Sequence, residues 1–327
     1  MPFDLPDWPL FGLAEDVRPA LRAARAAGEA SVLVTLFSVE GGGPRPPGAQ
    51  MLFAGGLAAG FLSGGCVEGD VAIHAARTLA DGEPRRLVYG EGGPWPDIRL
   101  LCGARIELLV ERIAPDDAAA EALMAATDAR RPVVWRTDGA ARRVIADPPP
   151  GQPDCRVWAS PFVVERLYEP VLRVIVVGGD PTALATAQLA AQAGFAATLV
   201  RPKGPSAPPG LQGVAYHRGE PAAALAEVGI DPWTAVAVAT HDWDVDQAAL
   251  EVALASPAAY VGVLGARRRL PERLARLRAA GVTDAQIARL KAPIGLDLGG
   301  KAPWEVAVAI VAEMVAGRHS ARPAGAD

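Results

Sequence analysis

The chain has 327 residues, of which 50% are apolar and 21% are charged, and its formal net charge is −5 at pH 7. This length favours about two domains, and the apolar content is that of a globular protein rather than a disordered one. The excess of acidic residues argues against a broad nucleic-acid-binding surface, which needs clustered Lys and Arg.

The N-terminal segment and the cysteines limit where the protein works. Acidic residues interrupt the first 20 positions, from Asp4 to Asp16, so neither a signal peptide nor a membrane span is expected and we predict a cytoplasmic protein. Cys66, Cys102 and Cys155 are odd in number and form no C-x-x-C pair, which disfavours a disulfide framework or a structural zinc site. Any cysteine function is therefore that of a thiol.

Residues 1–168 predict a mixed α/β domain. The periodicity of apolar residues indicates helices over 13–28, 67–80 and 115–130, and strands over 31–39, 51–53, 57–61, 87–89, 106–110 and 133–135. The run from Gly41 to Gly48 is dominated by glycine and proline, so it predicts a stiff loop with exposed backbone between two strands.

Residues 169–327 predict a Rossmann-like domain with a doubly wound parallel sheet. Apolar strands at 172–177, 197–200, 235–239 and 260–264 alternate with helices at 181–193, 247–254, 270–280 and 304–316. This alternation is typical of parallel strands covered by helices on both faces.

The glycine loop of the first domain is a candidate anion site. Gly41, Gly42 and Gly43 allow a close backbone approach, and Arg45 carries a charge that can bind phosphate through two donors. The alternative is a tight connection between strands with Arg45 on the surface.

The segment Ser63-Gly64-Gly65-Cys66 precedes a predicted helix. The helix dipole should favour the thiolate form of Cys66, although a small buried cysteine is the alternative. Glu68 lies in the first helical turn, where an acidic residue also stabilises the helix start. Cys102, just before Gly103, could bring a second thiol near the first, and Cys155 has no such setting and is interpreted as structural.

The first strand of the second domain ends in Gly178-Gly179-Asp180-Pro181, where a dinucleotide-binding fold carries G-x-G-x-x-G. Asp180 would repel a pyrophosphate and Pro181 lacks an N–H, so NAD(P) binding is disfavoured. Arg201 stands where an acidic residue usually binds the ribose and would suit a phosphate, which leaves NADP conceivable.

Three further segments of the second domain carry polar residues at predicted strand ends. His241 and Asp242 follow one strand, and they form either a functional site or a polar turn with a helix cap. Gly265 and Arg267 begin a second possible anion site, and Asp297 lies in a loop rich in glycine and apolar residues, which is either a site loop or an ordinary turn.

These segments together resemble the XdhC/CoxI family of proteins that mature xanthine dehydrogenase and related molybdenum hydroxylases. The resemblance covers nearly the whole chain, from Gly41–Ala49 and Ser63–Gly69 through Thr240–Asp242 and Tyr260–Arg268 to Ala292–Gly299, with Cys102-Gly103 as a weaker match. Asp180, Pro181 and Arg201 depart from the family pattern, which has Gly and His and then an acidic residue at these positions.

The resemblance implies an accessory protein that binds molybdenum cofactor as cargo, assists its sulfuration by a cysteine desulfurase and inserts it into a xanthine dehydrogenase-type apo-enzyme. Cys66 would contact the metal, because a soft thiolate suits molybdenum. The remaining cofactor contacts would come from Gly41, Gly42, Gly43, Arg45, Ser63, Gly64, Gly65, Glu68, Cys102, His241, Asp242, Gly265, Arg267 and Asp297. A chaperone of this kind needs no catalytic residue, and a protein of this size commonly forms a homodimer. An NADP-dependent oxidoreductase with His241 as acid–base is one alternative, and a purely structural assembly factor is another.

Overall fold

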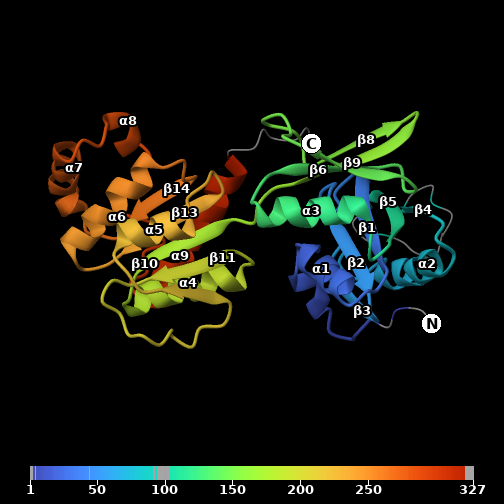
Figure 1. The fold of residues 1–327 in the computed structure, drawn as a ribbon, viewed down its shortest axis with the longest axis horizontal. Coiled ribbons are helices and arrows are strands. Elements are labelled where there is room, and N and C mark those ends of the chain that lie inside the picture. The colour runs from blue at the N-terminus through green and yellow to red at the C-terminus, as the bar shows by residue number, and fades with distance from the viewer. Residues whose placement is uncertain are drawn as a thin grey trace. The chain divides into compact units, whose positions relative to one another are not determined.

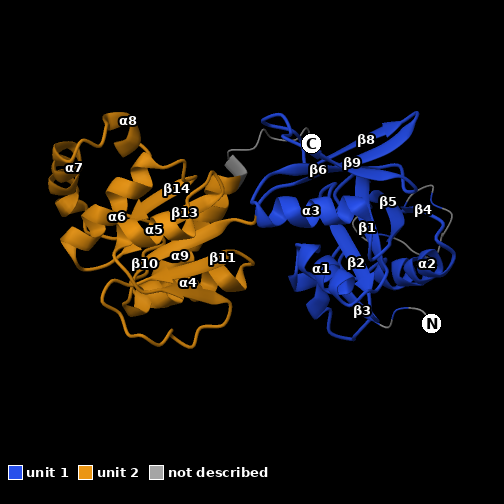
Figure 2. Cartoon of the chain, in the orientation of Figure 1, with its two compact units in different colours: residues 1–170 blue, residues 171–327 orange. Residues whose placement is uncertain are grey.

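The computed structural model describes residues 3, 5–43, 45–90, 93, 100 and 103–320. The chain forms two compact units, Met1–Pro170 and Val171–Asp327 (Figure 2). The division falls after Pro170, within the range 168–172 in which the sequence pattern places the boundary. Of the helices in the described part, none is both long and apolar enough to cross a membrane.

Two antiparallel sheets lie in the described part of the first unit (Figure 1). The larger sheet has the strand order β3-β2-β1-β5-β4 and contains β1 (Ser31–Glu40), β2 (Gln50–Ala54), β3 (Leu57–Gly60), β4 (Arg85–Tyr89) and β5 (Arg105–Ile113). The smaller has the order β7-β6-β9-β8 and contains β6 (Val133–Thr137), β7 (Arg142–Ala146), β8 (Cys155–Ala159) and β9 (Phe162–Tyr168). The helical elements are η1 (Leu10–Leu13), α1 (Arg18–Ala26), α2 (Glu68–Asp81) and α3 (Ala118–Asp128).

The larger sheet is buried on both faces, which explains why β1 reads as a continuous apolar run. Val32 and Val34 pack into the core that holds α2, with Val71 and Ala75. Leu33 points to the opposite face, into the core that contains residues of α1 and α3. This alternation follows from the two-residue period of a strand.

Two expectations for the first unit differ from the structure. The first α-helix begins at Arg18, not at residue 13, because the Asp16 carboxylate accepts the Arg18 backbone N–H at 3.0 Å and pairs with its guanidinium. The strand β9 was not assigned from the sequence. The strands β7 and β8 were not expected either, since both are short and largely unburied. Strands of this kind lack the apolar signal on which sequence reasoning depends.

The described strands of the second unit form one parallel sheet with the order β12-β11-β10-β13-β14-β15. They are β10 (Arg173–Gly178), β11 (Ala196–Val200), β12 (Val214–His217), β13 (Thr234–Ala239), β14 (Tyr260–Val263) and β15 (Leu290–Lys291). The helical elements are α4 (Pro181–Gln192), α5 (Pro221–Val228), α6 (Trp243–Ala255), η2 (Arg267–Arg269), α7 (Leu270–Ala279), α8 (Asp284–Ile287) and α9 (Pro303–Ser320).

Helices cover both faces of this sheet (Figure 1). One core combines alternate residues of the strands with α4 and α9, and the other combines the intervening residues with α5, α6 and α7. The doubly wound Rossmann-like prediction is therefore confirmed. The short elements β12, β15, α5 and α8 were not expected from the sequence.

A buried ionic network ties the two sheets of the first unit together. Glu111 on β5 is fully buried and accepts hydrogen bonds from Trp135 Nε1 at 3.2 Å and Thr137 Oγ1 at 2.8 Å, both on β6. Arg142 on β7 donates to Glu111 at 3.0 Å and to Asp117, the N-cap of α3, at 2.7 Å. A single guanidinium thus neutralises two carboxylates, one of which has no access to water.

Replacing Arg142 with Met should destabilise the first unit strongly. The change leaves the buried carboxylate of Glu111 without its cation, and the loss of one partner of a buried ion pair typically costs about 3–5 kcal/mol. Urea titration of the full chain would measure the change in the free energy of unfolding.

The control is Arg22→Met, which removes a pair with Asp128 whose side chains are 47% and 64% exposed. We expect a loss of about 1 kcal/mol or less there, as for other exposed ion pairs. Equal effects of the two substitutions would contradict the role assigned to Arg142.

Candidate functional site

The register of the larger sheet brings the predicted loops of the first unit to one edge. Glu40, the last residue of β1, pairs with Arg105 at the start of β5, and Tyr89 at the end of β4 pairs with Ile106. Gly60 at the end of β3 pairs with Met51, near the start of β2. The connections β1–β2, β3–α2 and β4–β5 therefore all leave the sheet at the same edge. These connections carry the glycine loop, the Cys66 segment and Cys102.

Ser63 and the two following glycines shape the loop before α2. Gly64 and Gly65 have φ values of +101° and +97°, a left-handed conformation that favours glycine. The Ser63 hydroxyl oxygen accepts hydrogen bonds from the backbone N–H groups of Cys66 and Val67, both at 3.1 Å. The loop therefore turns tightly over a buried serine.

The buried carboxylate of Glu68 accepts hydrogen bonds from the backbone of this loop. It is 2% exposed and accepts hydrogen bonds from the backbone of Leu62 at 3.1 Å, Ser63 at 2.7 Å and Gly65 at 2.9 Å, and from the Ser63 hydroxyl at 2.6 Å. Burial by itself would raise the pKa of Glu68, but the hydrogen bonds, led by those from Ser63, outweigh it and lower the pKa. Glu68 thus stabilises the loop and the helix start, as its place in the first turn indicated, and a contact of Glu68 with the cofactor stays a prediction.

Cys66 is exposed, two residues before the first residue of α2. The alternative of a small buried cysteine is therefore wrong. Its neighbour Val67 is fully buried in the core and anchors the chain beside the thiol.

Cys155 differs from Cys66, because burial raises the pKa of its thiol to about 12. Cys102, the other predicted thiol, lies outside the described residues.

The glycine loop packs against the start of β5. A side chain at Gly41, whose φ is +78°, would meet the backbone of Gly103 at 3.5 Å. Arg45 donates from Nη1 to Glu15 at 2.7 Å, so it is paired here, while its Nε is buried and has no hydrogen-bond partner among the described residues. Gly42 is exposed with open space where a side chain would be.

Two residues near this edge were not singled out from the sequence. Tyr89 donates to Asp70 on α2 at 2.6 Å, and His74 Nε2 lies 3.5 Å from the same carboxylate. The pKa values of both side chains depart from their ordinary values, and burial is the largest cause: it raises the pKa of Tyr89 and lowers that of His74. The four-residue spacing of Asp70 and His74 on a helix was the available signal, but the partnership with Tyr89 needs the fold.

Among the described residues of the second unit, two pockets of about 500 Å³ each lie at the carboxyl edge of the sheet, and both are lined by Thr240 and His241. One is also lined by Gly265 and Arg267. The edge where strands end is the usual place for ligands in such folds. The structure therefore brings the predicted His241, Gly265 and Arg267 together.

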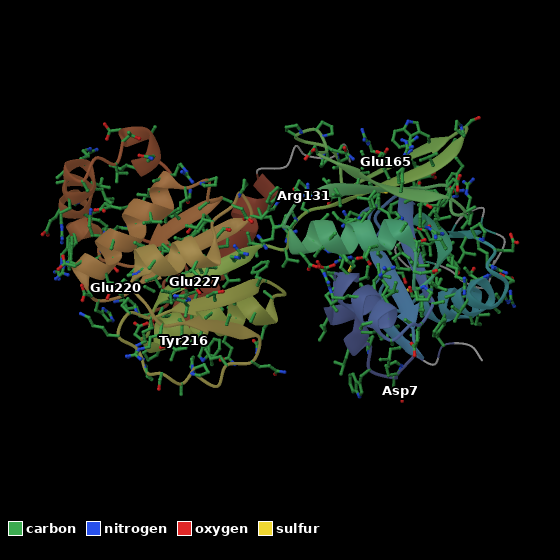
Figure 3. All side chains as sticks on the ribbon, viewed as in Figure 1. Asp7, Arg131, Glu165, Tyr216, Glu220 and Glu227 are labelled. Atoms are coloured by element: carbon green, nitrogen blue, oxygen red, sulfur yellow. The ribbon has the colours of Figure 1, made fainter. Side chains whose placement is uncertain are left out.

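The other pocket occupies the position of a dinucleotide site. Asp180 caps α4 by accepting the Ala183 N–H at 2.8 Å, and His241 Nε2 lies 3.3 Å from its other oxygen. The Arg201 side chain crosses Gly179 so closely that a Cβ there would collide with it. Glu220, labelled in Figure 3, also lines this pocket. The chain's own carboxylate thus occupies the helix start that would face a pyrophosphate.

The remaining predicted residues have local partners. Asp242 caps α6 by accepting the N–H groups of Asp244 at 2.9 Å and Val245 at 3.2 Å, as the helix-cap alternative predicted. Asp297 lies 3.3 Å from Arg267, and both side chains are more than three-quarters exposed. Within the described part of the chain, no cluster of three or more His, Cys, Asp or Glu side chains could hold a metal ion.

Glu68→Gln should destabilise the first unit by about 1–3 kcal/mol at pH 7, the usual penalty for buried donors that lose their acceptor. Since the pKa of Glu68 is lowered from 4.5 in the folded chain, its contribution is present above that value and is lost as the pH falls through the lowered pKa. The Tm difference between wild type and variant should therefore shrink in acid.

The matched control is Glu83→Gln, which changes an exposed carboxyl just after α2. This substitution should leave Tm unchanged both at pH 7 and in acid. A Tm difference for Glu68→Gln that stays constant from pH 7 into acid would show that charge on Glu68 does not hold the loop.

Family models match both halves of the chain. The model described as "XdhC Rossmann domain" matches residues 174–314, and the one described as "XdhC and CoxI family" matches residues 24–90. These matches cover the parallel sheet of the second unit and the glycine loop and Cys66 segment of the first.

Curated relatives and a solved structure agree with these matches. A protein of Escherichia coli (strain K12) named "Molybdenum cofactor insertion chaperone PaoD" is 31% identical over 313 residues, which cover 94% of this chain and 90% of that protein. A Bacillus subtilis (strain 168) protein, named as a probable subunit of xanthine dehydrogenase, is 26% identical over 88% of this chain and 93% of its own. The crystal structure of a Bacillus halodurans protein, titled a xanthine dehydrogenase, matches this chain with a TM-score of 0.74 and 24% sequence identity. The match covers 94% of this chain and 97% of that one, and it supports the fold.

Proposed function

The chain belongs to the XdhC and CoxI family, and from this premise we propose that it is an accessory protein that binds molybdenum cofactor as cargo. In this role it assists sulfuration of the cofactor and its insertion into a molybdenum hydroxylase of the xanthine dehydrogenase type. The names of the Escherichia coli and Bacillus subtilis relatives support the accessory role.

The observation that carries this proposal is the exposed thiol of Cys66 on a loop held by buried hydrogen bonds. A thiolate is a soft ligand and suits the molybdenum centre of the cargo. A loop that is already ordered loses little conformational entropy when the cargo binds, which favours affinity. Cys66 is therefore the proposed contact to the metal.

Arg45 is the proposed partner of the cargo's phosphate. Its buried Nε has no partner among the described residues, and its Nη1 is paired only with the largely exposed Glu15. An exposed ion pair contributes little, so Arg45 can exchange Glu15 for a phosphate at low cost. Gly42 has open space where a side chain would be, which leaves room for close approach of the phosphate to the backbone. Gly41 is a further proposed contact.

The other contacts and the partners are proposed on the family resemblance. A cysteine desulfurase, an apo-enzyme of the xanthine dehydrogenase type and a second copy of the chain are the proposed partners. The further proposed cofactor contacts are Gly43, Ser63, Gly64, Gly65, Cys102, His241, Asp242, Gly265, Arg267 and Asp297.

Cys66→Ala should abolish most of the retention of molybdenum while leaving the fold intact, because the hydrogen bonds that hold the loop come from Glu68 and Ser63 rather than from the exposed thiol. The measurement is molybdenum content per chain after gel filtration of protein purified from cells that make the cofactor. Circular dichroism would establish that the variant is folded.

Cys155→Ala is the control, since this thiol is largely buried and has a raised pKa. Its molybdenum content should match that of the wild type. If Cys66→Ala retained as much molybdenum as the control, a role for Cys66 at the metal would be excluded.

Arg45→Ala should weaken binding of the phosphorylated pterin by about 1.5–3 kcal/mol, the typical contribution of a hydrogen bond to a charged group. Glu15→Gln removes only the competing carboxylate, so it should leave affinity equal or higher. Affinity is measured by titration of the cofactor into each variant. An unchanged affinity in Arg45→Ala would mean that Arg45 does not face the phosphate.

A further inference from the structure

One of the two pockets of the second unit is lined by arginines that follow β14. It is lined by Thr240 and His241 after β13, by residues 264–269 after β14 and by Arg273 on α7. Arg267, Arg268 and Arg269 are exposed, whereas Arg273 is 6% exposed. We call this the arginine pocket.

Arg273 is held in place by a buried acid but has a donor left over. Its Nη2 donates to Asp246 at 2.8 Å, and Thr240 donates to the other oxygen of Asp246 at 2.5 Å. Nη1 of Arg273 is buried and has no hydrogen-bond partner among the described residues. The Arg273 guanidinium also lies over the Trp243 ring, 4.8 Å from its centroid, but an aromatic face offers no oxygen acceptor. Because buried polar groups are normally hydrogen-bonded, the unpaired Nη1 of a pocket-lining arginine points to a missing acceptor.

The charge around the pocket also favours an anion. Four arginines line it, and Asp246 is the one acidic residue among the described lining residues. The Asp246 carboxylate is already engaged by Arg273 and Thr240, so it offsets little of the remaining positive charge. Asp297 neutralises Arg267 only through an exposed contact of 3.3 Å.

We propose that the arginine pocket binds the phosphate group of a small phosphorylated molecule, with Nη1 of Arg273 as the innermost donor. A phosphate carries more acceptor oxygens and more negative charge than a carboxylate, so it suits a pocket lined by four arginines better. The volume of about 500 Å³ exceeds that of a bare phosphate and lies in the usual range for small ligands. His241, Gly265 and Arg267 of this pocket are also among the proposed contacts of the molybdenum cofactor, but the phosphate site rests on Arg273 and its neighbouring arginines and not on the Cys66 loop of the first unit.

The test is calorimetric titration of the full chain with inorganic pyrophosphate at low salt. Arg268→Ser removes an exposed charge from the pocket and should weaken binding by roughly 10-fold, and Arg273→Lys should weaken it by roughly 10- to 100-fold, the effect of losing charged hydrogen bonds. Lys keeps the positive charge beside Asp246, so this variant is chosen to preserve the fold. If it nevertheless misfolds, Arg268→Ser decides the question.

Three controls separate this site from general charge effects. Arg278→Ser removes an exposed arginine from α7, the helix that also carries Arg273. Arg278 pairs with Asp284 and does not line the pocket, so the substitution should leave pyrophosphate affinity unchanged. Pyrophosphate binding that is lost in Arg45→Ala belongs to the loop of the first unit, whereas binding that persists in Arg45→Ala and is weakened in Arg268→Ser belongs to the arginine pocket. Acetate should bind far more weakly than pyrophosphate.

The proposal is overturned if wild-type protein does not bind pyrophosphate at millimolar concentration, or if Arg268→Ser binds it as tightly as wild type. It is also overturned if Arg278→Ser loses as much affinity as Arg268→Ser, since binding would then reflect net charge alone. Equal affinity for acetate would contradict the choice of phosphate.

Discussion

The buried carboxylate of Glu68 is the constraint on which the candidate site of the first unit depends. It accepts hydrogen bonds from the backbone on both sides of the left-handed Gly64-Gly65 pair, at Ser63 and Gly65. Without this acceptor, buried N–H groups would lose their partners. The position of the exposed Cys66 thiol thus follows from an acid that itself has almost no contact with solvent.

The antiparallel sheet provides the second condition, because it decides which loops meet. The pairing of Glu40 with Arg105 places the end of β1 beside the start of β5, and Gly41 then packs against Gly103. A side chain at Gly90 would collide with the backbone of Ala104, so the end of β4 also lies close to this edge. A glycine loop, a cysteine loop and a third connection thereby share one edge of the sheet.

In the second unit, three acidic residues at the sheet edge are engaged by the protein itself. Asp180 caps α4, Asp242 caps α6 and Asp246 pairs with Arg273. The arginines are less fully engaged, since Arg268 is exposed and Arg273 keeps one nitrogen without a partner among the described residues. The edge therefore combines neutralised acids with available cationic donors, which is a setting for an anionic ligand.

The sequence by itself determined the long elements and the fold class of both units. Buried strands such as β1 and β13 have continuous apolar runs, and their periodicity is a local property of the chain. The sequence also indicated that Asp242 could cap a helix, because a cap lies next to the helix it serves. Short exposed strands such as β7 carry too weak an apolar pattern to be predicted.

The tertiary structure alone decided which polar groups are exposed and which are buried in hydrogen bonds or ion pairs with other parts of the chain. Glu68 and Cys66 stand two positions apart, yet one is buried and the other exposed. Arg273 carried no signal in its own segment, and only the packing of α7 beside α6 brings it to Asp246, 27 residues away in sequence. Burial and long-range pairing depend on how distant segments pack, and no local pattern of residues encodes that.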